Sequence, residues 1–273
     1  LMLRANLSFN NGKSNSGSSN YYFPLSGIDS IPLTNWSQGD NDGINVGIGG
    51  NYMLRIGEKA GRTMFINFGA NYSDSGSGSE NSSQKLIRSD SIQVIQQLSH
   101  NDSYNYSLNG GVTYAEPISE QAQVTLEYRI NYRKTDADRL TNLYDFEADK
   151  YNDFISPEYS NRHNTDYLTQ NVGPGFRYGK EGTSISARLN YQNVKMNSDR
   201  EFPQAWVLPE KTFHNLTYSG NARIKLDMQN RINFRFSSRT SNPSVGDLQD
   251  VVDISNVNNI RSGNPHLKPT YNH

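Results

Sequence analysis

Residues 105–132 read as two β-strands in which every second side chain is apolar. Tyr106, Leu108, Val112 and Tyr114 alternate with polar residues, and after a polar turn at 116–120 the same alternation runs over positions 122 to 132. A repeat of two residues is typical of a strand whose two faces meet different surroundings. One face here is uncharged and apolar and the other is polar, so the stretch predicts an antiparallel hairpin with two unlike faces.

The same alternation recurs along the chain, at 1–9, 44–56, 64–72, 168–178, 185–191, 216–226 and 232–236. This predicts about nine to ten strands, most of roughly 9 to 13 residues. Short turns are expected at 58–62, 116–120, 179–182 and 227–230, and long polar loops at about 10–43, 73–102, 133–165, 193–213 and 239–269. Short turns at one end and long loops at the other are typical of an all-β, antiparallel transmembrane β-barrel with short periplasmic turns and long extracellular loops. The strands predict part of a larger barrel.

Composition excludes the main alternatives. The hydrophobic fraction is 34%, with a mean hydropathy of -0.78, which is too little for the continuous core of a soluble sandwich. An aromatic share of 11% argues against disorder. A barrel needs only one apolar row in each strand, because lipid replaces the second layer of protein. The net charge of -1 gives no bias towards nucleic acid, and the lack of cysteine excludes disulfides and thiolate metal sites.

Charged side chains follow the same alternation. The apolar rows carry none, as a lipid-facing row requires, since Arg or Lys facing lipid costs about 2–4 kcal/mol at mid-bilayer. The polar rows carry Glu127 and a basic set that we expect to face the lumen and to contact a plug or an anionic ligand: Arg4, Arg55, Arg129, Arg177, Arg188, Arg223, Lys225, Arg231 and Arg235. The alternative to a role in ligand binding is that these arginines hydrogen-bond only to a plug or to each other. Pro174 falls on an apolar row and predicts a bulge or kink at 172–175.

The end of the chain, SNPSVGDLQDVVDISNVNNIRSGNPHLKPTYNH (241–273), resembles a segment of TonB-dependent outer-membrane receptors, especially the Bacteroidetes outer-membrane β-barrel proteins. In those proteins a loop ending in G-N-P-x-L-K-P leads into the next barrel strand. The matching residues are Gly263, Asn264, Pro265, Leu267, Lys268 and Pro269. The resemblance implies a barrel of about 22 strands with an N-terminal plug. Residues 1–273 are then expected to form part of one barrel domain, with the plug and the other strands outside this chain.

No catalytic or metal-binding constellation stands out. The five histidines lack metal-ligand spacing, no serine lies in a nucleophile signature, and the acidic turn at 40–43 lacks the remaining ligands of a calcium loop. We therefore expect no enzyme, no metal and no cofactor. The loop predicted at 133–165 carries ligand-contact candidates, namely Tyr144, Phe146, Tyr151 and Phe154. The alternative is a solvated loop that packs its own aromatic rings.

The first functional hypothesis is the barrel portion of a TonB-dependent receptor for energised uptake of a scarce ligand across the bacterial outer membrane. Its expected partners are outer-membrane lipid, a surface lipoprotein and, by resemblance, the TonB complex through an N-terminal segment outside this chain. No nucleic acid is expected. The alternative is a non-transporting surface barrel, an adhesin or scaffold, that acts through its loops. An outer-membrane hydrolase is the weaker third hypothesis.

Overall fold

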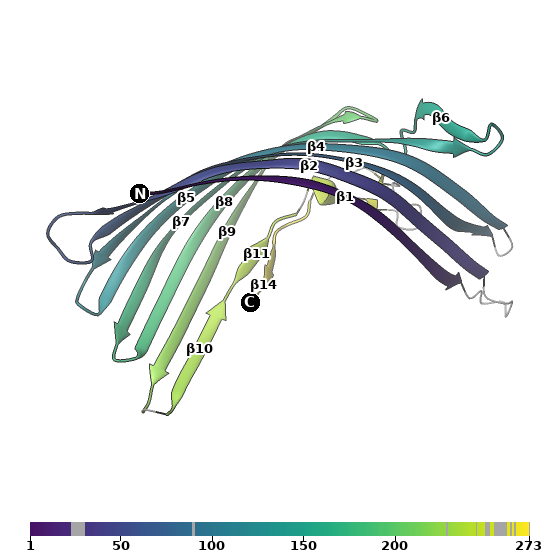
Figure 1. The fold of residues 1–273 in the computed structure, drawn as a ribbon. Coiled ribbons are helices and arrows are strands. Elements are labelled where there is room, and N and C mark those ends of the chain that lie inside the picture. The colour runs from purple at the N-terminus through teal and green to yellow at the C-terminus, as the bar shows by residue number, and fades with distance from the viewer. Residues whose placement is uncertain are drawn as a thin grey trace.

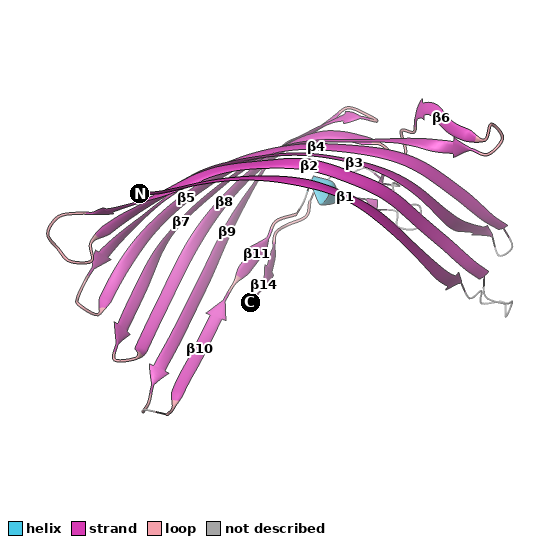
Figure 2. Cartoon of the chain, viewed as in Figure 1, coloured by secondary structure: helices cyan, strands magenta, loops and turns pink. Residues whose placement is uncertain are grey.

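The structure is a computed structural model that describes residues 1–22, 31–88, 91–227, 229–243, 245–248, 252–253, 261–262, 264 and 266–272. Nearly all of these residues are extended (Figure 2). The elements are β1 (Met2–Tyr22), β2 (Ile31–Arg55), β3 (Thr63–Arg88), β4 (Ser91–Pro117), β5 (Ala122–Asp145), β6 (Lys150–Ile155), β7 (Asn161–Lys180), β8 (Thr183–Phe202), β9 (Trp206–Lys225), β10 (Arg231–Ser237), β11 (Arg239–Ser241), α1 (Val245–Leu248), β12 (Val252–Asp253), β13 (Arg261–Ser262) and β14 (Thr270–Asn272).

The main sheet is a ten-stranded antiparallel meander. Its strand order is β1-β2-β3-β4-β5-β7-β8-β9-β10, and β6 pairs with β5 beside this path. The sheet is arched and stays open between β1 and β10 (Figure 1). The antiparallel all-β prediction is confirmed, and the ten strands of the main sheet agree in number with the nine to ten expected from the alternation.

The four short turns form where the sequence predicts them. Backbone hydrogen bonds close the first, from the amide of Arg62 to the carbonyl of Lys59 at 3.2 Å. Gly61 and Gly182 have φ values of 89°, a left-handed conformation that side chains with a Cβ rarely adopt. In the last turn the Asp227 carboxylate accepts the amide of Asn230 at 2.7 Å. Local chemistry therefore fixes this end of every hairpin.

Four of the five long loops predicted from the sequence are wrong, and the fifth, at 239–269, lies partly outside the described residues. Strands β2, β3, β4 and β5 run for 25, 26, 27 and 24 residues, so most of the stretches 10–43, 73–102 and 133–165 belong to paired strands. The stretch 193–213 likewise lies largely in β8 and β9. These segments are rich in Ser, Asn and Gly, which have low intrinsic strand preference. A ladder extended by neighbours on both sides overrides that preference, because backbone groups pair whatever the side chain.

The bulge predicted at 172–175 is also not formed. Strand β7 keeps one register with β8 on both sides of Gly173 and Pro174, and only the pairs at these two residues are missing. Proline has no amide hydrogen to donate to the ladder. A Cβ on Gly173 would lie 2.1 Å from the carbonyl oxygen of Leu189, so the two backbones approach too closely for any other residue. The ladder is interrupted without a shift.

The registers place all apolar rows on one face, which we call the outer face. Leu7 is opposite Val46, Val46 is opposite Tyr72, and Tyr72 is opposite Tyr106. Large side chains on this face are open to solvent, with Phe9 73% exposed and no second layer covering it in the described part of the chain. The sequence prediction of two unlike faces is confirmed.

The apolar band of the outer face has a sharp upper boundary, away from the short turns. In β2 to β5 the last apolar residue of the row is followed, two positions further up the same face, by a charged one: Ile44 by Asp42, Tyr72 by Asp74, Tyr104 by Asp102, and Tyr132 by Lys134. A bilayer is crossed by about 9–11 strand residues. About half or more of each of these strands therefore projects beyond the band. No helix in the described ranges is long and apolar enough to cross a membrane.

Candidate functional site: the inner wall of the sheet

The polar rows share the opposite face, which we call the inner face. The registers put every residue of the predicted basic set on this face: Arg4, Arg55, Arg129, Arg177, Arg188, Arg223, Lys225, Arg231 and Arg235. One transverse row runs from Arg55 through Thr63 on β3 and Thr125 on β5 to Arg188 on β8. All nine side chains are exposed. The structure thus brings the set onto one wall, spread over seven strands.

Glu127 is the one acidic side chain of the central inner face, and two arginines bind it. Its Oε1 lies 2.8 Å from Nε of Arg129 on the same strand, and its Oε2 lies 3.1 Å from Nη1 of Arg188 two strands away. Strand β7 passes between them, and it carries Gly173 and Gly175 at the crossing. Without side chains there, the Arg188 guanidinium can cross β7 to the carboxylate.

Most of the basic set has no acidic partner. Arg223 donates from Nε to the amide oxygen of Asn233 at 3.2 Å. For the other members, Arg4, Arg55, Arg177, Lys225, Arg231 and Arg235, the described residues supply no ion pair. The wall of β5 to β10 therefore carries a net positive charge, although the whole chain is nearly neutral.

Sequence reasoning missed three further arginines on the same face, Arg133, Arg139 and Arg200. They lie in segments that were expected to be loops. Arg133 stacks over the ring of Tyr167 at 4.9 Å, and Arg200 is buried, with its Nε donating to the carbonyl of Gln204 at 2.9 Å. The apolar row that marks residues 122–132 as a strand ends at Tyr132, because positions 134, 136 and 138 are Lys, Asp and Asp, so no apolar alternation identified these arginines as strand residues.

Part of the C-terminal segment folds back against the upper inner face (Figure 1). Leu248 of α1 and Met196 of β8 are both fully buried against each other, and Tyr167, Trp206 and Phe213 surround them. Beside this contact, Asn215 is 1% exposed and donates to the side-chain oxygen of Asn242 at 3.0 Å. The hydroxyl of Tyr271 in β14 donates to Asn215 Oδ1 at 3.4 Å. Asn215 thus fastens both ends of the segment to the wall.

The family motif lies in this returning segment. Gly263 and Pro265 are outside the described residues. The amide of Asn264 donates to the carbonyl of Asp247 at 2.6 Å, and the amide of Leu267 donates to the carbonyl of Asn264 at 3.2 Å. After Lys268 and Pro269 the chain enters β14, which pairs antiparallel with β11. A strand therefore follows the motif, but it belongs to a separate two-stranded sheet with β11 and not to the main sheet.

The four aromatic candidates lie on a hairpin of β5 and β6 and not on a loop. Tyr144 packs edge-on against Tyr151 and Phe146, with ring centroids 5.1 Å apart in both pairs. The Tyr151 hydroxyl donates to Glu80 of β3 at 2.5 Å; burial and then this carboxylate raise the pKa of Tyr151 to about 12. Phe146 and Phe154 are 58% and 85% exposed. The set divides into two rings that hold the hairpin and two that face solvent.

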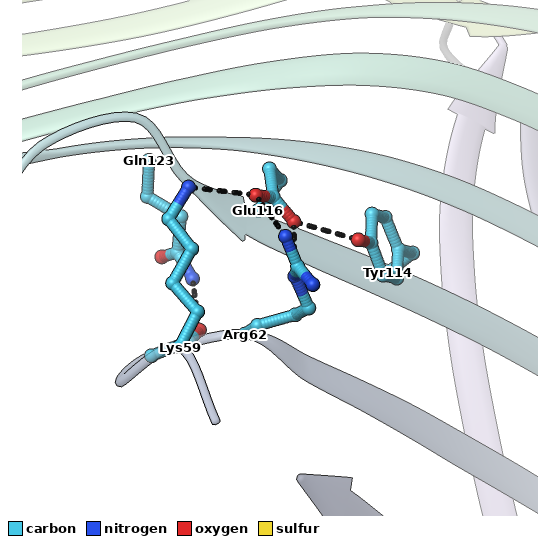
Figure 3. A network of polar contacts seen from close by, with 6 residues as sticks. Lys59, Arg62, Tyr114, Glu116 and Gln123 are labelled. Atoms are coloured by element: carbon cyan, nitrogen blue, oxygen red, sulfur yellow. Dashed lines mark hydrogen bonds and ion pairs between the residues drawn. The ribbon is translucent and has the colours of Figure 1, made fainter. Parts of the chain in front are cut away.

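A polar clamp ties the first two short turns together (Figure 3). The Glu116 carboxylate accepts hydrogen bonds from Nζ of Lys59 at 2.8 Å, from Nε of Arg62 at 2.8 Å and from the hydroxyl of Tyr114 at 2.6 Å. The bonds from Arg62, then Lys59, then Tyr114 hold the pKa of the Glu116 carboxyl well below its usual range. The two basic side chains share this one carboxylate, so the cluster keeps a net charge of about +1 while it ties the turns together.

Burial lowers the pKa of His163, whose Nδ1 has no hydrogen-bond partner. In the part of the chain that the structure describes, no three His, Asp or Glu side chains gather closely enough to hold a metal ion.

Comparison with known proteins agrees with this geometry. The model of a family described as "Outer membrane protein beta-barrel family" matches residues 57–273, well over half of the chain. The chain belongs to that family, and its place is the bacterial outer membrane. No curated protein matches it. Among solved structures, one titled "Copper transporter OprC" is similar at 9% identity and a TM-score of 0.39, over 98% of this chain and 50% of that one. The chain thus spans half the length of that structure, and a likeness of this degree carries no argument about function.

Proposed function

We propose that this member of the outer membrane protein β-barrel family forms part of the wall of a TonB-dependent receptor that takes up a scarce ligand. The observation that carries the proposal is the asymmetry of the two faces. The outer face offers lipid an uncharged band, while the inner face offers a basic, hydrated wall partly covered by a segment of the same chain. A wall with these properties suits the passage or capture of a polar solute.

The tall strands fit the same proposal. We place the short turns in the periplasm and the projecting ends of β2 to β5 outside the cell, where they extend the wall above the membrane. A solute captured there meets Arg139 and Arg133 before it reaches the central arginines. TonB coupling and a plug rest on the resemblance of the C-terminal motif to TonB-dependent receptors.

The test is whether the full-length protein engages the energy-transducing partner. The purified periplasmic domain of TonB is passed over full-length protein immobilised in detergent. Saturable binding is expected, and it should disappear when the first residues of the mature full-length protein are removed. Absence of binding by correctly folded protein would refute a TonB-dependent receptor.

A surface-binding barrel is the second candidate. It is favoured by Phe146 and Phe154, two exposed aromatic side chains on the β5–β6 hairpin. Exposed aromatic groups of this kind often serve as contact points for a partner. A barrel that fails to bind TonB, yet loses cell-surface adhesion when both phenylalanines are changed to Ser, would establish this alternative.

A further inference from the structure

We infer that the lower inner wall holds a binding site for an oxyanion, a phosphate, sulfate or carboxylate group, between Arg177 and Arg188. This inference rests on the proposed function, since it assigns a chemical class to the ligand that the wall receives. It is carried by a hollow of about 300 Å³ on the inner face, which these two arginines line together with Thr125, Ser186 and Ser219.

The floor of the hollow is backbone. Gly175 lies opposite Thr125 on one side and Arg188 on the other. A Cβ on this residue would lie 2.5 Å from the Thr125 hydroxyl oxygen and 3.9 Å from Nε of Arg188. Glycine thus leaves open the space in which a ligand would touch the hydroxyl and the guanidinium at once.

Arg188 is held in place for this task. Its Nη1 is bound to Glu127 at 3.1 Å, which draws the side chain across β7. The described residues give its Nε and Nη2 no other partner, so donors remain on a guanidinium that is already oriented. Such pre-orientation lowers the entropy lost when a ligand binds.

Arg177 supplies charge that nothing neutralises. It is exposed, lies opposite Ser186 on β8, and has no ion pair or hydrogen bond to any described residue. Two guanidinium groups and three hydroxyls, with a single carboxylate shared by Arg188 and Arg129, match an oxyanion, which takes several charge-assisted hydrogen bonds.

The wall above leads to the hollow. Arg139 and Arg133 on β5 are followed on the same face by Arg129, and the hollow lies below them, beside the short turns. A series of cations on one wall raises the local concentration of anions and guides them along it. We therefore place the hollow at the lower end of an anion-attracting track.

Calorimetric titration of the full-length protein in detergent tests the inference, with inorganic phosphate as the probe and constant ionic strength set by chloride. Saturable binding is expected, and R177Q/R188Q should weaken it at least tenfold, as the loss of charge-assisted hydrogen bonds predicts. K134Q is the control, because Lys134 lies on the outer face of the sheet, away from the hollow. It should bind phosphate as the parent does. Resistance of the folded barrel to denaturation by detergent without heating verifies that each variant is folded.

Equal phosphate binding by R177Q/R188Q and the parent would overturn the site, and so would the absence of saturable binding to the parent. Lower thermal stability of R177Q/R188Q without any phosphate binding by the parent would also overturn it, because an acidic segment of the protein would then occupy the hollow. The outcome is independent of TonB. Phosphate binding without TonB binding would support the oxyanion site and refute the TonB-dependent receptor. TonB binding without phosphate binding would support the receptor and refute the oxyanion site.

Discussion

The contact between Leu248 and Met196 makes a quantitative prediction about the returning segment. Both side chains are fully buried, and the segment has few other apolar anchors in the described residues. Removing a buried leucine side chain costs about 2–5 kcal/mol. Because a docked segment is a local structure with a local stability, L248A should undock it without unfolding the sheet. A cost of about 2 kcal/mol raises the undocked population about 30-fold.

Cysteine labelling measures that population directly, because the chain contains no cysteine. Val194 is 2% exposed and lies on the inner face, between Met196 and the row that contains Asn215. Met196 and Asn215 both bind the returning segment, so the reactivity of V194C reports whether the segment covers this part of the wall. The V194C thiol should react slowly with a maleimide, and V194C/L248A should react about 30-fold faster or more. L267A, at a leucine of the same segment that is 41% exposed, should leave the rate unchanged. Rapid labelling of V194C alone, or equal rates with and without Leu248, would refute the docked arrangement.

Three further predictions concern the rest of the sheet. G173A should lower the free energy of unfolding in urea by about 1–3 kcal/mol or more, because its Cβ would overlap a β8 carbonyl oxygen, whereas G179A, with 3.9 Å of clearance, should change it little. E116Q should destabilise the protein at pH 7 more than E120Q does. Because the pKa of the Glu116 carboxyl is lowered in the folded state, its ionised form stabilises the fold at pH values above the ordinary carboxyl pKa of 4.5. The difference in stability between the two variants should therefore shrink as the pH falls below about 4. Y151F should remove a component above pH 11 from the tyrosine absorbance titration, since the pKa of Tyr151 is about 12, and a loss at pH 10 instead would contradict its bond to the acidic partner on β3.

The sequence predicts which face of the sheet each side chain in the apolar band lies on, but it does not predict how far the strands extend beyond that band. Alternation of apolar and polar residues assigns the face of Leu126 or Arg188 without any model of the fold, because side chains of a strand alternate strictly. The same rule fails for 73–83, where Ser, Asn, Gly and Asp occupy both rows. Water bathes both faces of the sheet above the membrane, so selection for an apolar row ends there. The strand continues because its backbone pairs on both sides.

Within the site, the basic set was predictable and its partners were not. The alternation of side chains along each strand is enough to place Arg129 and Arg188 on the inner face. Their shared carboxylate depends on two glycines of β7 that let a side chain cross a whole strand, a relation between residues far apart in sequence. The docking of Leu248 was equally hidden, since a single helical turn in a polar segment has no periodic signal. Arg133 and Arg139 were missed because the apolar row ends at Tyr132 and the stretch that follows was assigned to a loop.

The distribution of charge between faces decides how this protein can meet a ligand. A net charge of -1 suggests indifference to ionic partners. The structure separates the charges, with basic side chains on the inner wall of β5 to β10 and Asp42, Asp74 and Asp102 on the outer face above the band. The electric field of the basic side chains acts mainly on the inner side of the sheet and that of the aspartates mainly on the outer side, because the sheet lies between the two groups. An anion inside the arch meets an almost unopposed basic wall, so the near-zero total charge conceals an inner face that attracts anions.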